Sequence, residues 1–406
     1  MSALCGIKVL DLSRVLAGPW AGQLLADYGA DAIKVEQPGK GDDTRAWGPP
    51  YLRDAAGNDT TEAAYYLSAN RNKRSMTINL AHADGQRLVR ELALQSDIVI
   101  ENFKVGGLKK YGLDAASLLA LNPRLIYCSI TGFGQTGPLA TEPGYDAMIQ
   151  AQGGLMSVTG LPDGVPGGGP MKVGIAVVDL MCGMYAVTAI LAALQHRERT
   201  GAGQHIDVAL LDTQVAWLSY LNMNHLTTGM VPPRYGTAHP SIVPYQAFQT
   251  SDGHLMLTVG NDGQFQRFCV CAGAPELAGD PRFAHNADRV RNRDECIATV
   301  QQLLLARGTE EWLRALREAD VPAGPINTID KVFDDEQVQA RGMRMSLTHP
   351  LAGEVPLLAN PVRFSASPIE YRHAPPLLGQ HTEEVLRERL GLSSDEIAAL
   401  RVSGVI

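Results

Sequence analysis

The stretch Ile7-Lys8-Val9-Leu10-Asp11-Leu12 begins an alternation of strand and helix signals that decides the fold. It is short and aliphatic, and it predicts a buried strand. A helical pattern follows from about Gly18 to Tyr28, and Gly29 ends it. Ala32-Ile33-Lys34-Val35-Glu36 predicts the next strand, which Pro38-Gly39 stops. Strands separated by helix-length segments indicate parallel βαβ units, so the expected class is α/β with a doubly wound parallel sheet.

The alternation continues along the chain and then changes character. Further strands are predicted at 98–100, 125–130 and 205–210, and helices at 88–94 and 186–196. From about 222 to 243 the composition turns to Gly, Pro, Thr and His, which marks a crossing between domains. A predicted hairpin (245–250 and 254–259) and two amphipathic helices (294–306 and 310–319) then form a smaller α/β unit. We therefore expect a large domain over 1–221, a small domain over 222–340 and a C-terminal segment over 341–406.

Composition sets limits on the function. The 406 residues are 45% hydrophobic and 19% charged with a net charge of −8, so the chain is globular and a poor candidate for nucleic-acid binding. Six scattered cysteines without a Cys-x-x-Cys pair favour reduced thiols, a cytoplasmic location and no structural metal. The first residues carry no signal-peptide pattern.

One apolar run, 173–194, is long enough to span a bilayer. Asp179 and small residues such as Gly174 and Gly183 interrupt it. An Asp at mid-membrane costs about 2.5–3.5 kcal/mol on the insertion scale, so we expect a buried strand over Val173–Val178 and then a buried helix from about Met181.

Gly132-Phe133-Gly134-Gln135-Thr136-Gly137 matches the dinucleotide fingerprint and follows a predicted strand. Pro138 comes next, no helix signal follows, and no acidic residue ends a following strand at the required distance, so we do not expect nicotinamide binding. Another interpretation is not excluded, namely that these glycines form a loop whose backbone a different ligand approaches closely.

Asp179 is the most informative carboxylate. It can cap the predicted helix, and at a strand end facing a crevice it is also placed as a nucleophile. Two basic clusters, Asn70–Arg74 and Lys104/Lys109/Lys110, are either solvated or contact phosphate. Tyr145-Asp146 reads as a turn and helix cap, and His239 as a ligand-binding or a linker residue.

At this point the chain resembles the class III (CaiB/BaiF-type) CoA-transferases. The resemblance covers nearly the whole chain, and its marks include Gly6–Asp11, Ala17-Gly18-Pro19, Gly41–Arg45, Asn72–Ser75, Glu101-Asn102-Phe103, Val177-Val178-Asp179, Thr200–Gln204, Gly324-Pro325-Ile326 and Leu378–Thr382. Within the family it is most similar to the branch that moves CoA between succinyl-CoA and glutarate, through Asp43–Pro50, Cys128–Gly132, Gly236–His239 and Ser241–Gln246.

The resemblance implies a Rossmann-like large domain built from both ends of the chain, a small domain, and a homodimer of interlocked subunits. It implies that Asp179 attacks the donor thioester to form an aspartyl-acyl anhydride and then an aspartyl-CoA thioester. No metal or resident cofactor is implied, CoA thioester is the substrate, and no membrane or nucleic-acid partner is expected.

The family's CoA contacts carry over to Val15, Leu16, Ile78, Asn102, Phe103 and Lys110, and Arg74 is added as a phosphate contact. Gln37 stands where the family often has Arg, so Lys34 or Lys40 is a candidate replacement. For the acceptor we expect Tyr145 and Asp146 at the site, with Arg71, Arg234 and His239 as candidates to meet the second carboxylate of a dicarboxylate. Backbone N–H groups of Gly132–Gly137 and Gly167-Gly168-Gly169 are candidate oxyanion donors.

Two alternatives stay open. The α-methylacyl-CoA racemases share the implied fold, but this chain has Gly144-Tyr145-Asp146 at the place of the Gly-His-Asp motif of those racemases. Tyr cannot shuttle an α-proton near neutral pH as His can. A CoA-binding protein without catalysis is disfavoured because Asp179 is present. The formyl-CoA transferases' flexible glycine loop is absent, and the His239 loop takes about that place, so oxalate is not the expected acceptor.

Overall fold

The computed structural model describes all 406 residues, which form two compact units. The first comprises Met1–Leu155, Val173–Thr228 and Gln337–Ile406, and the second comprises Met156–Lys172 and Gly229–Glu336. The sequence placed residues 156–172 in the large domain, whereas the structure assigns them to the second unit. Gly and Pro are frequent in that excursion, as in Gly167-Gly168-Gly169-Pro170, but this composition marks a loop and does not show which unit the loop joins.

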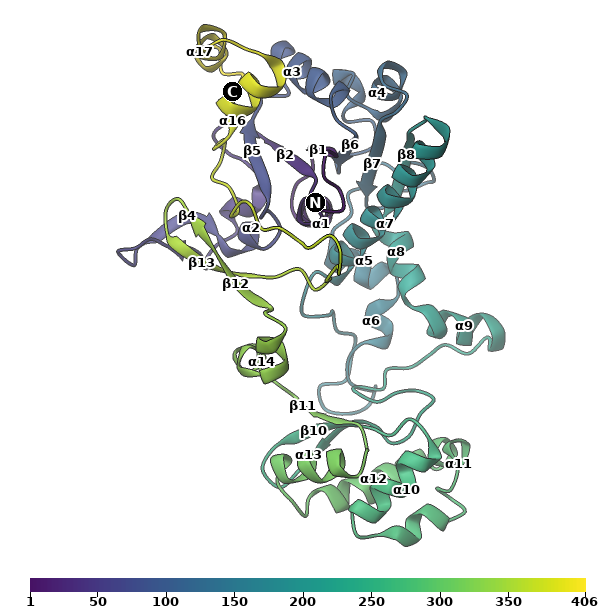
Figure 1. Cartoon of the computed structure of the whole chain (residues 1–406). Coiled ribbons are helices and arrows are strands. Elements are labelled where there is room, and N and C mark those ends of the chain that lie inside the picture. The colour runs from purple at the N-terminus through teal and green to yellow at the C-terminus, as the bar shows by residue number, and fades with distance from the viewer. The chain divides into compact units, whose positions relative to one another are not determined.

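The first unit is built on a six-stranded parallel sheet of order β5-β2-β1-β6-β7-β8 (Figure 1). Its strands are β1 Lys8–Asp11, β2 Asp31–Glu36, β5 Lys73–Thr77, β6 Ile98–Glu101, β7 Ile126–Thr131 and β8 Gln204–Ala209. All five pairings are parallel. The strand order reverses between β1 and β6, and in such sheets the ligand crevice lies outside the carboxyl ends at that point.

Helices cover both faces of this sheet (Figure 1). One apolar cluster joins the sheet to α1 (Ala17–Asp27) and α7 (Val177–Thr200). The other joins it to α3 (Ala83–Leu94), α4 (Ala115–Leu121), α16 (Thr382–Leu390) and α17 (Ser394–Val402). The last two helices come from the C-terminal segment, so both ends of the chain contribute to one core. The doubly wound parallel architecture predicted from the sequence is confirmed.

The second unit has a three-stranded antiparallel sheet of β9 (Tyr245–Gln249), β10 (His254–Thr258) and β11 (Ala323–Pro325). Its core contains Phe248, Phe265, Phe268 and Trp312, all at most 1% exposed. Its helices are α10 Asp262–Cys271, α11 Asn286–Arg291, α12 Arg293–Leu304, α13 Thr309–Glu318 and α14 Ile329–Asp334, with α6 (Leu155–Val158) at its boundary with the first unit.

The remaining elements belong to the first unit. They are α2 Ala64–Ser68, α5 Asp146–Gln152, α8 Leu210–Trp217, α9 Ser219–Thr228 and α15 Glu336–Ala340, with the hairpins β3–β4 (Tyr51–Arg53, Asp59–Ala63) and β12–β13 (Arg344–His349, Gly353–Leu358). Short 3₁₀ turns cover Asp43–Ala46, Lys109–Tyr111 and, in the second unit, Pro275–Gly279.

One predicted strand is wrong. Residues 173–176 have no strand structure, and α7 already begins at Val177 with Ala176 at its N-cap position. A short apolar run does not distinguish a strand from the start of a buried helix. Asp179 is therefore the third residue of the helix and not its cap. By length and composition α7 could cross a membrane, yet half of its most apolar window is buried within the fold.

A network of buried charges lies among β1, β2 and β5. The Lys73 ammonium is 2.9 Å from Asp11 Oδ2, and it also donates to the Pro19 carbonyl at 2.7 Å. Lys34 pairs with Asp42 at 2.8 Å. Burial lowers the pKa of Lys73 to about 8, although Asp11 opposes this shift. Each of these charges is fully or almost fully buried, so each depends on its partner.

We predict that Lys73→Met destabilises the first unit by about 3–5 kcal/mol, because it leaves the Asp11 carboxylate buried without its cation. Urea unfolding followed by far-UV circular dichroism measures the loss. Glu91→Gln is the matched control, since its pair with Arg87 is exposed and such pairs contribute about 1 kcal/mol or less. Equal midpoints for the two variants would contradict the prediction.

Candidate active site

Two adjoining pockets lie at the carboxyl ends of β1, β2 and β6. The first, here called the β2 pocket, is a cavity of about 250 Å³. The second, the Asp179 pocket, is a cavity of about 210 Å³. Arg14 and Phe103 line both cavities, so this pair stands at the border that the two share. The guanidinium of Arg14 lies 5.5 Å from the centre of the Phe103 ring.

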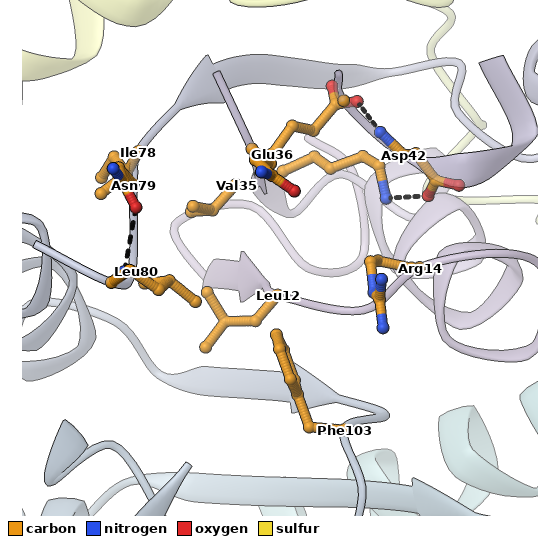
Figure 2. Close-up of a pocket in the computed structure, with 13 residues that line it drawn as sticks. Leu12, Arg14, Val35, Glu36, Asp42, Ile78, Asn79, Leu80 and Phe103 are labelled. Carbon is orange, nitrogen blue, oxygen red and sulfur yellow. Dashed lines mark hydrogen bonds and ion pairs between the residues drawn. The ribbon is translucent and has the colours of Figure 1, made fainter. Parts of the chain in front are cut away.

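The β2 pocket has apolar walls and a charged end. Figure 2 shows Leu12, Val35, Leu80 and Phe103 pointing into the same space, with Arg14 on the side nearer Asp42. Such a cavity suits a flat, largely apolar ring system with polar edges. Gln37 also lines it, at the position where a cation was expected.

Asp179 lines the second pocket from the first turn of α7. The free N–H groups of that turn are met by Asp146 at the start of α5, whose Oδ1 accepts from Val178 at 2.8 Å and from Asp179 at 3.4 Å. Asp146 therefore caps α7 from another helix, and the carboxylate of Asp179 is left for the pocket.

Burial raises the pKa of Asp179 to about 7, and the negative charge of Asp146 adds to this shift. A helix N-terminus ordinarily stabilises a carboxylate. Here burial outweighs that effect, and Asp146 already accepts the Val178 and Asp179 N–H groups of the first turn. A carboxylate with this pKa is more basic than an exposed aspartate and is still substantially ionised near neutral pH.

Tyr65 on α2 is a site residue that sequence reasoning missed. Burial raises its pKa to about 12, and the charges of Asp179 and Asp146 contribute. Its ring packs edge-on against Trp47, with ring centres 5.2 Å apart. A neutral phenol can donate a hydrogen bond, and the charge of Asp179 acts on the pKa of this one. No sequence signal marks it, since it precedes a second tyrosine in an ordinary helical stretch.

The turn between β1 and α1 approaches the pocket in a strained conformation. Val15 has φ of 71°, which is unusual for a β-branched residue, and its N–H donates to both oxygens of Asp42 at 3.2 Å. Val15, Leu16 and Ala17 all line the Asp179 pocket. No side chain caps α1, so the N–H groups of its first turn are available beside the pocket.

The structure brings together most of the predicted contacts. Val15, Leu16, Asn102, Phe103, Tyr145 and Asp179 share the Asp179 pocket, and Ile78 lies with Phe103 in the β2 pocket. Gly132 also lines the Asp179 pocket, and a Cβ there would lie 2.6 Å from the Gly144 Cα, so this close approach requires glycine. No helix opens at Gly132–Gly137, as the sequence indicated.

Three predicted cations lie outside both pockets. Arg74 pairs with Asp31, Glu384 and Glu388, and Arg71 pairs with buried Asp27. Lys110 is exposed, with its ammonium 4.6 Å from the Tyr111 ring centre. The sequence shows the basic cluster but not its acidic partners, which are remote along the chain.

Two other candidates and the Gly167–Gly169 segment belong to the second unit. Arg234 pairs with Asp163 and donates to the Leu161 carbonyl at 3.2 Å. His239 Nδ1 accepts from the Ser241 N–H at 3.0 Å. Their roles toward an acceptor stay predictions.

The candidate replacements for an arginine at position 37 have different surroundings. Lys34 lines the β2 pocket, but its ammonium is fully buried and bound to Asp42 and to the Ser13 carbonyl. Lys40 is exposed and pairs with Asp43 at 2.7 Å. Arg14, which the sequence analysis did not single out, pairs with the other oxygen of Asp43 at 3.1 Å. Its place directly after β1 was the available signal.

Comparison with known proteins agrees with this geometry. The family model described as CoA-transferase family III matches residues 4–382. A succinate–glutarate CoA-transferase of Agrobacterium fabrum is 52% identical over 385 residues, covering 95% of each chain. A human succinyl-CoA:glutarate CoA-transferase is 43% identical over 401 residues, covering 99% of this chain and 89% of that protein.

A solved structure leads to the same assignment. The crystal structure of a CAIB/BAIF family protein from Brucella suis has a TM-score of 0.84 and 48% sequence identity, covering 96% of this chain and 99% of that one. From the match along almost the whole sequence and the shared fold, the chain belongs to CoA-transferase family III.

Proposed function

We propose that this CoA-transferase moves CoA from succinyl-CoA to glutarate through Asp179. The observation that carries the proposal is the carboxylate of Asp179, which has a pKa of about 7 and lines a pocket that shares Arg14 and Phe103 with the β2 pocket. The named relatives support the choice of donor and acceptor. The CoA thioester acts as a substrate and not as a resident cofactor.

The two cavities suit the two ends of CoA. The apolar walls of the β2 pocket fit the adenine ring, and the Asp179 pocket fits pantetheine with the thioester at its inner end. Arg14 lies between them, where the phosphates would pass, and its partner Asp43 is shared with Lys40. We propose that Arg14 and Lys40 exchange Asp43 for phosphate oxygens, which supplies the cation absent at Gln37.

The reaction proceeds by successive acyl transfers, and the total charge of the reacting groups does not change in any step. The Asp179 carboxylate attacks the succinyl carbonyl, and the C–S bond breaks to give an aspartyl-succinyl anhydride and CoA thiolate. The thiolate attacks the aspartyl carbonyl, which releases succinate and forms an aspartyl-CoA thioester. Glutarate then attacks this thioester to form a second anhydride and thiolate. Attack of the thiolate on the glutaryl carbonyl gives glutaryl-CoA and restores Asp179.

Groups around the pocket suit the charges that develop. The uncapped N–H groups of α1 and the backbone at Gly132 are candidate donors to the tetrahedral oxyanions. Tyr65 remains protonated at neutral pH because its pKa is raised, so it can donate near Asp179. His239, Arg71 and Arg234 stay candidates for the distal carboxylate of glutarate.

We also propose that the protein is a homodimer. Large apolar side chains on α7, α8 and α9 of the first unit are exposed, among them Met184, Tyr185, Val215, Trp217, Met223 and Leu226. A monomer rarely exposes so many in one region, and a second copy would cover them. Sedimentation velocity is expected to give twice the mass of one chain, and a monomer at micromolar concentration would contradict this.

The six cysteines are all free, and four of them are buried. This fits a reducing compartment, and we propose a cytoplasmic location.

Asp179→Ala is expected to abolish CoA transfer while the binding of CoA persists, because the nucleophile contributes little to the remote contacts. Wild-type protein with succinyl-CoA and a panel of dicarboxylates, read by mass spectrometry of the CoA products, should form glutaryl-CoA most efficiently. Quenching before acceptor is added should trap a mass increase on Asp179. Wild-type rates in the Asp179→Ala variant would refute the mechanism.

A separate experiment distinguishes CoA transfer from the racemase alternative. Deuterium exchange at the α-carbon of an acyl-CoA in D₂O, without any acceptor, would indicate proton abstraction and not transfer. We expect no such exchange.

The pH dependence follows from the pKa of Asp179. Only the carboxylate is nucleophilic, so kcat/KM for succinyl-CoA should rise as the pH increases through about 7. Asp146→Asn removes the neighbouring negative charge, lowers the pKa of Asp179 and should move this limb to lower pH, while its amide oxygen still accepts from Val178. Glu198→Gln removes a charge at the other end of α7 and is the control. Limbs at one pH in all three proteins would argue against Asp179 as the titrating group.

A further inference from the structure

Three neighbouring strands bring polar side chains into one row that the reaction above does not use. Glu101 on β6 lies opposite Ser129 on β7, and Ser129 lies opposite Asp207 on β8. His205 is two residues earlier on the exposed edge strand β8, and its Nε2 is 2.9 Å from the Ser129 hydroxyl. The row borders a third cavity of about 240 Å³, lined also by Lys104, Lys109 and Asp114.

The number of protons on each group determines which group donates in each hydrogen bond of this row. The Ser129 hydroxyl has one proton, which it donates in a hydrogen bond to the Glu101 carboxylate. The ring of His205 must then donate its Nε2 proton to the Ser129 oxygen. In a serine nucleophile the histidine accepts the serine proton instead, so this row is not a hydrolytic dyad. It is a relay of hydrogen bonds from the surface to a buried carboxylate.

The buried end of the relay holds the loop between the two substrate pockets. Glu101 Oε2 accepts the Phe103 N–H at 2.8 Å. The intervening Asn102 is fixed to the backbone of Arg14 in both directions, accepting at 2.9 Å and donating at 2.6 Å. Phe103 and Arg14 are the two residues that line both pockets. A shift of Glu101 would therefore move the wall that both ends of CoA share.

Glu101 has no cation in contact, which makes the relay important. Burial raises its pKa, the charge of Asp207 adds to this, and the donors Ser129 and Phe103 oppose it. His205 faces Asp207 on its own strand and packs edge-on against Tyr127 at 5.7 Å, and burial lowers its pKa. Around the cavity the facing charges are Lys104, Lys109 and Asp114.

We propose that Glu101 is a positioning residue for the CoA thioester, and that Ser129 and His205 hold it as the acceptor of the Phe103 N–H. The proposal rests on the CoA-binding role assigned above to the two pockets. His205 makes the relay accessible from the surface, so the arrangement couples the solvent pH to the CoA-binding loop.

The test measures CoA binding directly, by titration calorimetry in an Asp179→Ala background, so that titration of the nucleophile does not contribute. Glu101→Ala should weaken CoA binding about tenfold at pH 7.5, because the buried Phe103 N–H loses its acceptor. Ser129→Ala and His205→Ala should each weaken it about threefold. His205→Gln should restore binding, since its amide N–H can donate to Ser129. Ala116→Ser, on the wall of the same cavity, is the matched control.

The pH profile separates positioning from a merely structural role. Protonation of Glu101 makes it a poorer acceptor, so CoA binding should weaken as the pH falls. Ser129→Ala should begin to weaken at a higher pH, because it removes a donor that lowers the pKa of Glu101. Glu101→Gln should show no such dependence, because its amide oxygen accepts at every pH. If Glu101→Ala does not fold, the Ser129→Ala and Glu101→Gln profiles decide the matter.

The failures can be told apart. If Asp179→Ala protein binds no CoA at all, the assignment of the pockets fails. The relay is overturned, while the proposed transfer stands, by a different result. In it the Asp179→Ala protein binds CoA, the added Glu101→Ala change alters the affinity less than twofold, and the added Glu101→Gln change leaves the pH profile of CoA binding as it is in Asp179→Ala.

Discussion

The geometry of this enzyme depends on buried ion pairs among its parallel strands and the loop after β2. Lys73 with Asp11 links β5 to β1, and Lys34 with Asp42 links β2 to the loop that follows it. A paired buried charge adds little net stability, but a broken pair is costly, so the network penalises every alternative arrangement. Asp42 also holds the strained Val15 N–H. The same side chain therefore joins the core to the wall of the Asp179 pocket.

Burial and the charge of Asp146 make the ionised form of Asp179 less stable and more reactive. A carboxylate at a helix N-terminus is ordinarily stabilised by free N–H groups, but here Asp146 takes those of Val178 and Asp179 and adds its own negative charge. The folded protein consequently binds the Asp179 proton more tightly than the unfolded chain. The stability that this proton contributes is complete below about pH 4 and is lost as the pH rises through 7. In return, the ionised carboxylate is a stronger base and a better nucleophile toward a thioester.

The sequence predicted those strands and helices that a local hydrophobic pattern marks. It failed where side chains distant along the chain determine the structure. β1, β2, β6 and α1 were all expected, because aliphatic runs and glycine stops mark them. β5 was missed, since Lys73, Arg74 and Ser75 read as a polar surface until Asp11, Asp31 and Glu36 are seen to bind them. Asp179 was singled out by its place before a predicted helix, and the family resemblance added a role. Its raised pKa could not be predicted, because burial and the charge of Asp146 on another helix cause it.

The C-terminal segment shows why the site cannot be assigned to one stretch of the chain. Residues 372–382 run beside β5, where the Asn72 and Gly379 N–H groups bond to the His373 carbonyl and the Ser75 hydroxyl. Arg45, which binds Glu36 at the end of β2, also donates to the Pro376 carbonyl at 3.0 Å. Glu36 lines the β2 pocket, so this C-terminal segment completes the surroundings of a pocket that the N-terminal strands form. The pocket therefore reaches its final geometry only when segments 331 residues apart have packed together.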